Sequence, residues 1–133
     1  MSSFARPEAA GDGSLNAHDG QVWFYSPEHK TITLKTLFGL NPDPESDANF
    51  DGPDNITVSP HGGLIVAEDG EGINHLVGVT RRGHPYPLAR NENDENGEFC
   101  GPSFSLDGRI LFTNIQSPIF GGTFAITGPW HRR

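Results

Sequence analysis

The fold is decided by the stretch Phe50-Asp51-Gly52-Pro53-Asp54-Asn55-Ile56-Thr57-Val58-Ser59-Pro60-His61-Gly62-Gly63-Leu64-Ile65-Val66-Ala67-Glu68-Asp69. Its apolar and Gly-Pro segments predict a loop, a strand, a tight turn at residues 60–63, a second strand and an acidic loop. Because the turn reverses the chain, the hairpin begins and ends at the same side. The acidic and amide residues that flank the hairpin should therefore gather at one rim of a sheet. Converging oxygen ligands suit calcium, magnesium or oxidised iron.

The composition of the 133-residue chain indicates one ordinary domain with short strands. Hydrophobic residues make up only 34%, and the 17 glycines and 11 prolines favour many turns. The formal net charge of −8 argues against a nucleic-acid partner, because binding to the phosphate backbone requires a basic surface. This charge suits a cation site as well as it suits simple solubility.

The single cysteine, Cys100, excludes an intrachain disulfide and is interpreted as a small buried side chain. No run of residues is long or apolar enough to span a membrane, so no membrane partner is expected. Residues 1–10 lack the basic segment and apolar core of a signal peptide. These features leave the cellular location open.

Strand-forming runs recur along the chain and predict an all-β fold, because no segment shows a helical period. Residues 1–20 are expected to form a polar N-terminal loop. Alternation of Ile32 and Leu34 with polar neighbours predicts a half-buried strand there. The ranges expected to form strands are 21–25, 31–38, 55–59, 64–68, 75–80, 85–89, 103–105, 110–114 and 123–126.

A weak internal repeat predicts how these strands are grouped. Residues 50–53 correspond to Phe99-Cys100-Gly101-Pro102, and residues 59–66 correspond to residues 105–112. A repeat of roughly 40–50 residues with four short strands is typical of a β-propeller blade. We expect a single incomplete propeller domain over residues 1–133, in which residues 21–38 are part of a blade, 50–90 a blade and 99–130 part of a blade.

The expected number of blades is too small for a closed ring. We expect a partial β-propeller of about two to three blades of antiparallel four-stranded sheets, whereas closure needs ~4–8 blades. Either the chain is a fragment, or it assembles with other chains, or its sheets form an open stack. An open stack leaves unpaired sheet edges, which favour self-association.

Six segments together give the chain a resemblance to a known family. They are Phe4-Ala5-Arg6-Pro7-Glu8, Gly20-Gln21-Val22-Trp23, Phe50-Asp51-Gly52-Pro53-Asp54-Asn55-Ile56, Gly101-Pro102-Ser103-Phe104-Ser105-Leu106-Asp107-Gly108-Arg109, Leu111-Phe112-Thr113-Asn114-Ile115-Gln116 and Thr123-Phe124-Ala125-Ile126-Thr127-Gly128-Pro129-Trp130. In this order, and with the terminal Ile-Thr-Gly-Pro-Trp, they resemble the PhoX-type alkaline phosphatases, a bacterial β-propeller family. The resemblance spans nearly the whole chain but only the C-terminal portion of such enzymes.

The resemblance implies a phosphoric monoester hydrolase that uses calcium and iron and is usually exported. It also implies that upstream blades are missing, together with an iron-bound cysteine to which Cys100 does not correspond. We therefore expect a truncated or short relative that is weak or inactive alone and takes a phosphomonoester substrate if active. One alternative is a non-catalytic calcium-binding propeller segment. The other is a lactonase-like propeller hydrolase, which only residues 52–56 suggest.

The resemblance also selects candidate metal ligands on this chain. Glu8 is the first choice and Asp54 the second, and Glu98 stands where the family often has a glutamate. Asp51 and Asn55 are further candidates, although both residue types also stabilise turns. Carboxylates on different blades that point to one channel could hold such a metal cluster.

Other residues have weaker claims to a role in the site. Arg6 is the candidate for binding a substrate phosphate through its planar guanidinium group, although an ion pair with a neighbouring residue is the preferred interpretation. The acidic residues in 68–71 could bind calcium, but a solvated acidic loop is the preferred interpretation. His61 and His75 could also bind a metal, and His61 is discounted because it lies at the wrong end of the hairpin. Without a Gly-x-Ser-x-Gly or Walker motif, acyl transfer and nucleotide hydrolysis have no support.

Overall fold

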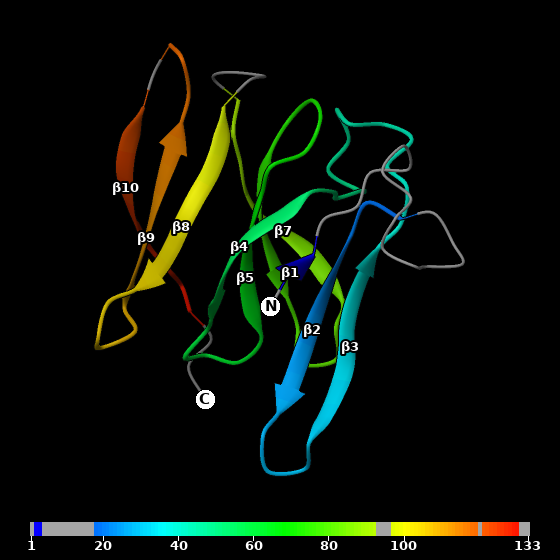
Figure 1. Cartoon of the computed structure of the whole chain (residues 1–133). Coiled ribbons are helices and arrows are strands. Elements are labelled where there is room, and N and C mark those ends of the chain that lie inside the picture. The colour runs from blue at the N-terminus through cyan, green and yellow to red at the C-terminus, as the bar shows by residue number, and fades with distance from the viewer. Residues whose placement is uncertain (1, 4–17, 93–96, 120, 131–133) are drawn as a thin grey trace.

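Every element that the computed structural model describes is a β-strand, which confirms the all-β prediction (Figure 1). The structure describes residues 2–3, 18–92, 97–119 and 121–130. Within these residues there is no helix, and therefore none that could cross a membrane. The strands are β1 (Ser2–Ser3), β2 (Gly20–Ser26), β3 (Thr31–Phe38), β4 (Pro53–Val58), β5 (Leu64–Glu68), β6 (His75–Val79), β7 (Pro85–Arg90), β8 (Glu98–Phe104), β9 (Ile110–Gln116) and β10 (Gly122–Thr127).

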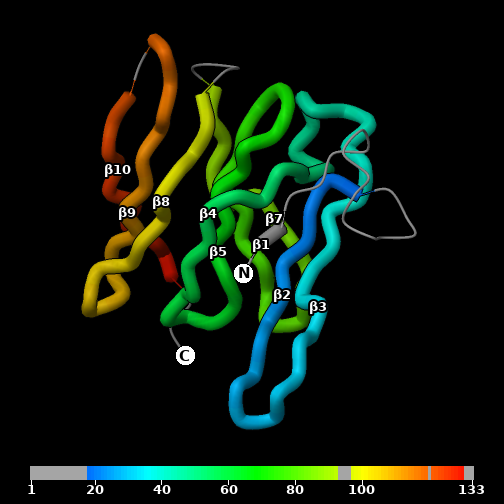
Figure 2. Tube along the Cα trace, viewed as in Figure 1, coloured from blue at the N-terminus to red at the C-terminus, as the bar shows by residue number. Residues whose placement is uncertain are grey.

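The strands form three antiparallel sheets that follow one another along the chain (Figures 1 and 2). The first sheet has the order β1-β2-β3, the middle sheet β4-β5-β6-β7 and the third sheet β10-β9-β8. Strand β4 contacts both β1 and β8, so the first strand of each sheet lies against that of the next. Innermost strands are neighbours in this way around the axis of a propeller. The arrangement agrees with the predicted blades of a partial β-propeller.

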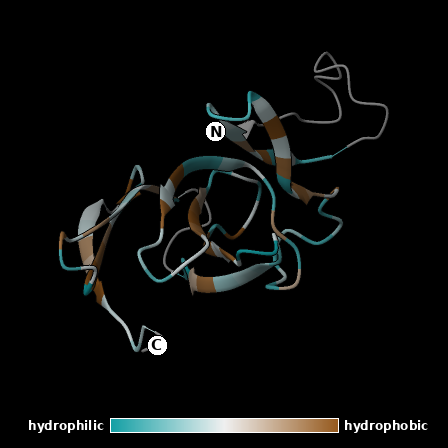
Figure 3. Ribbon diagram, turned by 90° about the horizontal axis from the view of Figure 1, so that it is seen from below, coloured by the Kyte–Doolittle hydropathy of each residue, from teal (hydrophilic) through white to brown (hydrophobic). Residues whose placement is uncertain are grey.

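The middle sheet is apolar on both faces because it packs between the other two sheets. On β5, Leu64 and Val66 point to the first sheet, whereas Ile65 and Ala67 point to the third. This alternation follows from the two-residue period of a strand. Figure 3 shows brown apolar segments on strands of the molecule and teal hydrophilic segments on several connecting loops. Two hydrophobic cores result. The first contains Val22, Phe38, Phe50, Val66, Val77 and Val79, and the second Ile65, Ala67, Leu76, Phe99, Leu111 and Ile115.

The turn between β4 and β5 depends on two glycines. Gly62 and Gly63 have φ angles of 101° and 84°, which L side chains rarely adopt. A Cβ atom on Gly63 would also lie 2.1 Å from the carbonyl oxygen of Val79, where β5 pairs with β6. The two glycines therefore allow the chain reversal, which places the start of β4 and the end of β5 together at the end of the sheet away from the turn.

The structure adds strand residues that the sequence pattern did not predict. Ser2–Ser3 pair with β2, although residues 1–20 were expected to be a loop. Strand β8 begins at Glu98 rather than at Ser103, and its register with β9 shifts between Cys100 and Ser103. This irregularity breaks the alternating pattern on which the prediction of the strand depended.

The prediction of a half-buried strand over residues 31–38 holds for the second half of β3, where Thr36 and Phe38 are buried, and is wrong for Ile32 and Leu34. Their side chains are 57% and 41% exposed, and Tyr25, which pairs with Ile32, is 58% exposed. The alternation correctly places Ile32 and Leu34 on one face of β3, but nothing in the described part of the chain covers that face. Periodicity identifies an apolar face without showing whether a neighbour packs on it.

Candidate functional site

Acidic side chains gather at the rim where β4, β6 and β8 begin and β5 ends. Pro53 at the start of β4 pairs with Glu68 at the end of β5, and Glu98 opens β8 in the neighbouring sheet. In Figure 1 this rim is at the top of the middle sheet, and the β4–β5 turn is at the bottom. The hairpin pattern in the sequence predicted that the acidic residues and the turn lie at opposite ends of the sheet. We call this end of the sheets the acidic rim, after Asp51, Asp54, Glu68, Asp69 and Glu98.

Three carboxylates on the acidic rim interact across two sheets. Glu98 of β8 forms a side-chain hydrogen bond with Asp69, which follows β5. Burial raises the pKa of Glu98, and the negative charges of Asp69 and then Asp54 of β4 raise it further. The sequence-predicted residues Asp54 and Glu98 are thus brought together, and Asp69 joins them. We call Asp54, Asp69 and Glu98 the carboxylate trio; a proton or a bound cation would relieve its repulsion.

Cys100 lies in the same neighbourhood as the carboxylate trio. Burial raises the pKa of its thiol, and the charges of Glu98 and Asp54 add to the rise. The thiolate is the form that binds metals and attacks substrates, so these neighbours disfavour both roles. Cys100 is only partly buried, whereas the sequence suggested a small buried side chain.

Asn55 holds the middle and third sheets together beside the carboxylate trio. Its Nδ2 donates to Oδ2 of Asp54 at 2.7 Å, and its Oδ1 accepts from the backbone N–H of Gly101 at 2.7 Å. The contact to Gly101 joins β4 to β8. The observed role of Asn55 is therefore to orient Asp54 and to connect two sheets, and its role as a ligand stays a prediction.

Asp51 belongs to a second acidic group, which is buried between the first and middle sheets. Its backbone N–H donates to Oε1 of Glu68, and its Oδ2 accepts from Nδ2 of Asn41 at 2.9 Å. Burial raises the pKa of Asp51 to about 6, despite the hydrogen bond from Asn41, and the charge of Glu68 adds to the rise. Gly70 leaves room for this carboxylate, because a Cβ atom at that position would overlap Oδ1 of Asp51.

Glu68 is the first member of a chain of ionic contacts that continues through His75 and Asp47 to Arg90. Oε2 of Glu68 accepts from both the backbone N–H and Nδ1 of His75, each at 2.8 Å. Nε2 of His75 donates to Oδ1 of Asp47 at 2.9 Å, and Nη1 of Arg90 donates to the same oxygen at 2.8 Å. We call these four residues the ion chain; it ties the loop before β4 to β5, β6 and β7.

Carboxylate oxygens on both sides of the His75 ring favour its charged form, which cannot bind a metal. Burial alone lowers the pKa of His75, but the hydrogen bonds to Glu68 and then to Asp47 outweigh it and raise the pKa above its ordinary value. In the charged form both ring nitrogens donate protons, so neither has a lone pair for a metal. The interpretation of residues 68–71 as a solvated loop is likewise wrong for Glu68, which is 2% exposed.

His61 has a structural role at the end of the hairpin opposite the acidic rim. Its Nε2 is 2.7 Å from the carbonyl oxygen of Gly108, to which it donates, and its ring stacks on Trp130 at 5.7 Å between centroids. The indole N–H of Trp130 donates to the carbonyl oxygen of Arg109 at 2.7 Å. The terminal tryptophan segment therefore closes the third sheet against the β4–β5 turn, which agrees with discounting His61 as a ligand.

The remaining predicted site residues, Arg6 and Glu8, lie outside the described residues. Among the residues that are described, no three His, Cys, Asp or Glu side chains are arranged to hold a metal ion. The carboxylate trio therefore has the donor atoms that a hard cation prefers but does not complete a metal site by itself.

The profile of the family described as Alkaline phosphatase PhoX matches residues 2–119, a range that includes the acidic rim and all the strands except β10. No curated protein and no solved structure matches the chain.

Proposed function

The chain belongs to the alkaline phosphatase PhoX family, and on this premise we propose that its acidic rim supplies carboxylates to a cation site for phosphomonoester hydrolysis. The observation that supports this proposal is the carboxylate trio. Asp54 and Glu98 come from different sheets, yet their charges meet Asp69 closely enough to raise the pKa of Glu98. A bound cation would relieve the mutual repulsion of these carboxylates.

Calcium is the cation for which the described donors are best suited. The trio offers only carboxylate oxygens, which are the ligands that calcium prefers, and the thiolate of Cys100 is disfavoured. Iron is expected from the family alone. We propose that Glu8 adds a ligand to Asp54 and Glu98, with Asp51 and Asn55 as secondary candidates because each already has a hydrogen-bond partner.

A phosphoester is the substrate class that the family implies. A divalent cation, when bound, neutralises phosphoryl oxygens and activates an oxygen nucleophile. The part that we assign to this chain is to hold carboxylates at fixed positions and, through Arg6, to bind the phosphate. Since the described residues do not complete a metal site, we propose that the chain alone hydrolyses phosphomonoesters weakly or not at all.

The proposal is tested by the effect of calcium on the melting temperature of the purified chain. Calcium should raise the melting temperature of the wild type and raise it less in Asp54→Asn and Glu98→Gln. Glu28→Gln is the matched control, because Glu28 is an exposed carboxylate in the β2–β3 turn, away from the acidic rim. Equal calcium effects in all four proteins would contradict the assignment of the site.

The accompanying activity assay separates the catalytic proposal from a non-catalytic one. Hydrolysis of p-nitrophenyl phosphate should be weak or undetectable, and any activity should vanish with a chelator. A clear calcium effect on stability without hydrolysis would favour a calcium-binding propeller segment, a function that the incomplete trio also supports. Lactone hydrolysis without phosphatase activity would instead favour the lactonase-like alternative.

A further inference from the structure

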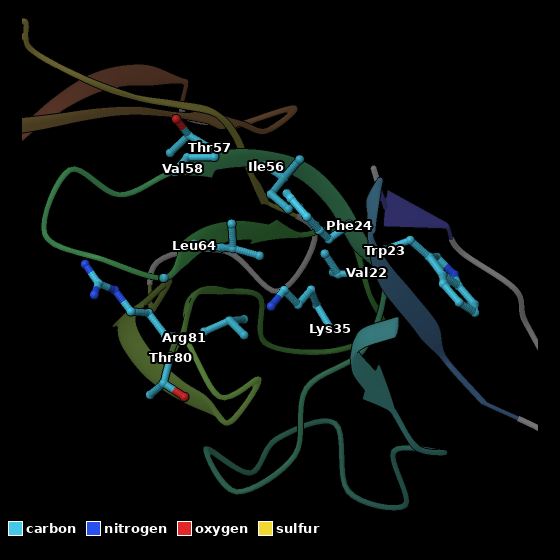
Figure 4. Close-up of a pocket in the computed structure, with 12 residues that line it drawn as sticks. Val22, Trp23, Phe24, Lys35, Ile56, Thr57, Val58, Leu64, Thr80 and Arg81 are labelled. Atoms are coloured by element: carbon cyan, nitrogen blue, oxygen red, sulfur yellow. The ribbon is translucent and has the colours of Figure 1, made fainter. Parts of the chain in front are cut away.

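An apolar groove of about 440 Å³ lies between the first and middle sheets, toward the end opposite the acidic rim (Figure 4). Val22 and Phe24 of β2 form one wall, and Ile56 and Leu64 of the middle sheet form the other. The volume lies within the range of ~300–1,000 Å³ that is typical of small-molecule sites. The groove is thus large enough for a ligand with an apolar body.

The groove is locally positive although the protein carries a net charge of −8. Its charged lining residues are Lys35 and Arg81, and none of the described lining residues is acidic. Figure 4 shows the amino group of Lys35 reaching into the space near Leu64 and Val22, whereas Arg81 stands at an edge. A ligand that fits this lining carries an apolar body and an anionic group.

Lys35 faces the groove because of an irregularity in the first sheet. The register between β2 and β3 shifts between Val22 and Trp23, where Val22 pairs with Thr36 and Trp23 pairs with Leu34. Lys35 is the extra residue, and its Nζ lies 5.7 Å from the centroid of the Phe24 ring. Such bulges change the direction in which side chains point, and here the ammonium group of Lys35 points toward the apolar walls of the groove.

Within the described residues, Lys35 makes no ion pair, and the aromatic contact leaves its ammonium N–H donors available. A partly buried ammonium group without an anionic partner is unfavourable, so an anion placed here would gain a charge-assisted hydrogen bond. Thr57 and Thr80 add hydroxyl groups to the lining. The chemistry selects an anion over a neutral or cationic ligand of the same shape.

We propose that this groove binds a small amphipathic carboxylate. Its apolar body lies against Val22, Ile56 and Leu64, and its carboxylate pairs with Lys35. The site is separate from the acidic rim, because the lining residues of the middle sheet come from the end of β4, the start of β5 and the end of β6. The proposal is therefore independent of the cation site and of any phosphatase activity.

The test is an NMR titration of the ¹⁵N-labelled chain with decanoate and, separately, with decan-1-ol, in the presence of a chelator. Decanoate should bind about tenfold or more tightly than decan-1-ol, because only decanoate forms the charge-assisted hydrogen bond. The shifted amide signals should include those of Val58, Leu64 and Thr80. Keeping the chelator present excludes any contribution from metal binding at the acidic rim.

Two substitutions with the same change in charge make the test specific. Lys35→Gln should remove the preference for decanoate, while its amide side chain keeps much of the aliphatic length. Arg82→Gln is the matched control, because Arg82 is an exposed residue next to Arg81 that does not line the groove. Equal binding of the two ligands by the wild type, equal effects of the two substitutions, or shifts confined to Tyr25 and Ile32 would overturn the proposal.

Discussion

Replacing Glu68 by Gln is the substitution from which we expect the largest loss of stability at the acidic rim. The carboxylate of Glu68 is 2% exposed and accepts three N–H groups, one from Asp51 and two from His75. Gln keeps a single carbonyl oxygen and turns an NH₂ group toward one of these donors. It also leaves the charge of His75 without its buried partner.

The expected magnitude follows from the burial of the pair. Removing one member of a buried ion pair costs about 3–5 kcal/mol, because the other member stays desolvated. At about 4 °C per kcal/mol for a chain of this size, the melting temperature should fall by about 12–20 °C. Domains are typically stable by only ~5–15 kcal/mol, so the loss is a large part of the total.

Urea unfolding followed by the fluorescence of Trp23 and Trp130 measures this loss. Glu28→Gln is the control, and it should change stability by no more than about 0.5 kcal/mol because Glu28 is exposed. His75→Leu, alone and combined with Glu68→Gln, gives the coupling between the two positions, expected at about 1–3 kcal/mol. A loss below about 1 kcal/mol for Glu68→Gln, or additive effects of the two substitutions, would refute the reasoning.

Three further substitutions test other parts of the structure. Asp51→Asn should stabilise the chain at pH 7 by about 1–3 kcal/mol, since burial raises the pKa of Asp51 from 3.8 to about 6. The stability that protonated Asp51 contributes is fully present below about pH 3.8 and is lost as the pH rises through about 6. The free energy of unfolding of the variant should therefore change less between about pH 4 and pH 7 than that of the wild type; an unchanged pH dependence would contradict this. Leu76→Ala should lose about 2–5 kcal/mol in urea unfolding, because Leu76 is fully buried in the second core, and a loss under about 1 kcal/mol would argue against that packing. Gly63→Ala should lose about 1–3 kcal/mol from its positive φ and its contact with Val79, and wild-type stability would show that the turn is misplaced.

The sequence predicted the architecture because the relevant signals are local. The short apolar runs of β5 and β9 and the glycine turn at Gly62 and Gly63 define hairpins without reference to the rest of the chain. The internal repeat then relates Phe50 to Phe99, and these two residues pack in the two separate cores of the structure. Because β4 and β8 occupy corresponding places in the repeat, Asp54 of β4 and Glu98 of β8 lie at the same rim.

The parts of the site that the sequence did not predict depend on contacts between distant residues. His75 meets Asp47 from the loop before β4, and only the folded structure shows that both of its nitrogens are occupied. Glu68 had a detectable signal, because it ends an otherwise apolar strand and lies opposite Pro53 in the hairpin. The orientation of Lys35 depends on a register shift that leaves no mark in the hydrophobic pattern.

The titration of Glu98 by ¹³C NMR tests the account most directly. With a chelator present, the pKa of its side-chain carboxyl should lie above the ordinary value of 4.5, because burial and the charges of Asp69 and Asp54 disfavour ionisation. Adding calcium should lower this pKa, since a cation bound to the carboxylate trio stabilises the ionised form. An ordinary pKa that calcium does not change would contradict the claim that the acidic rim is a cation site.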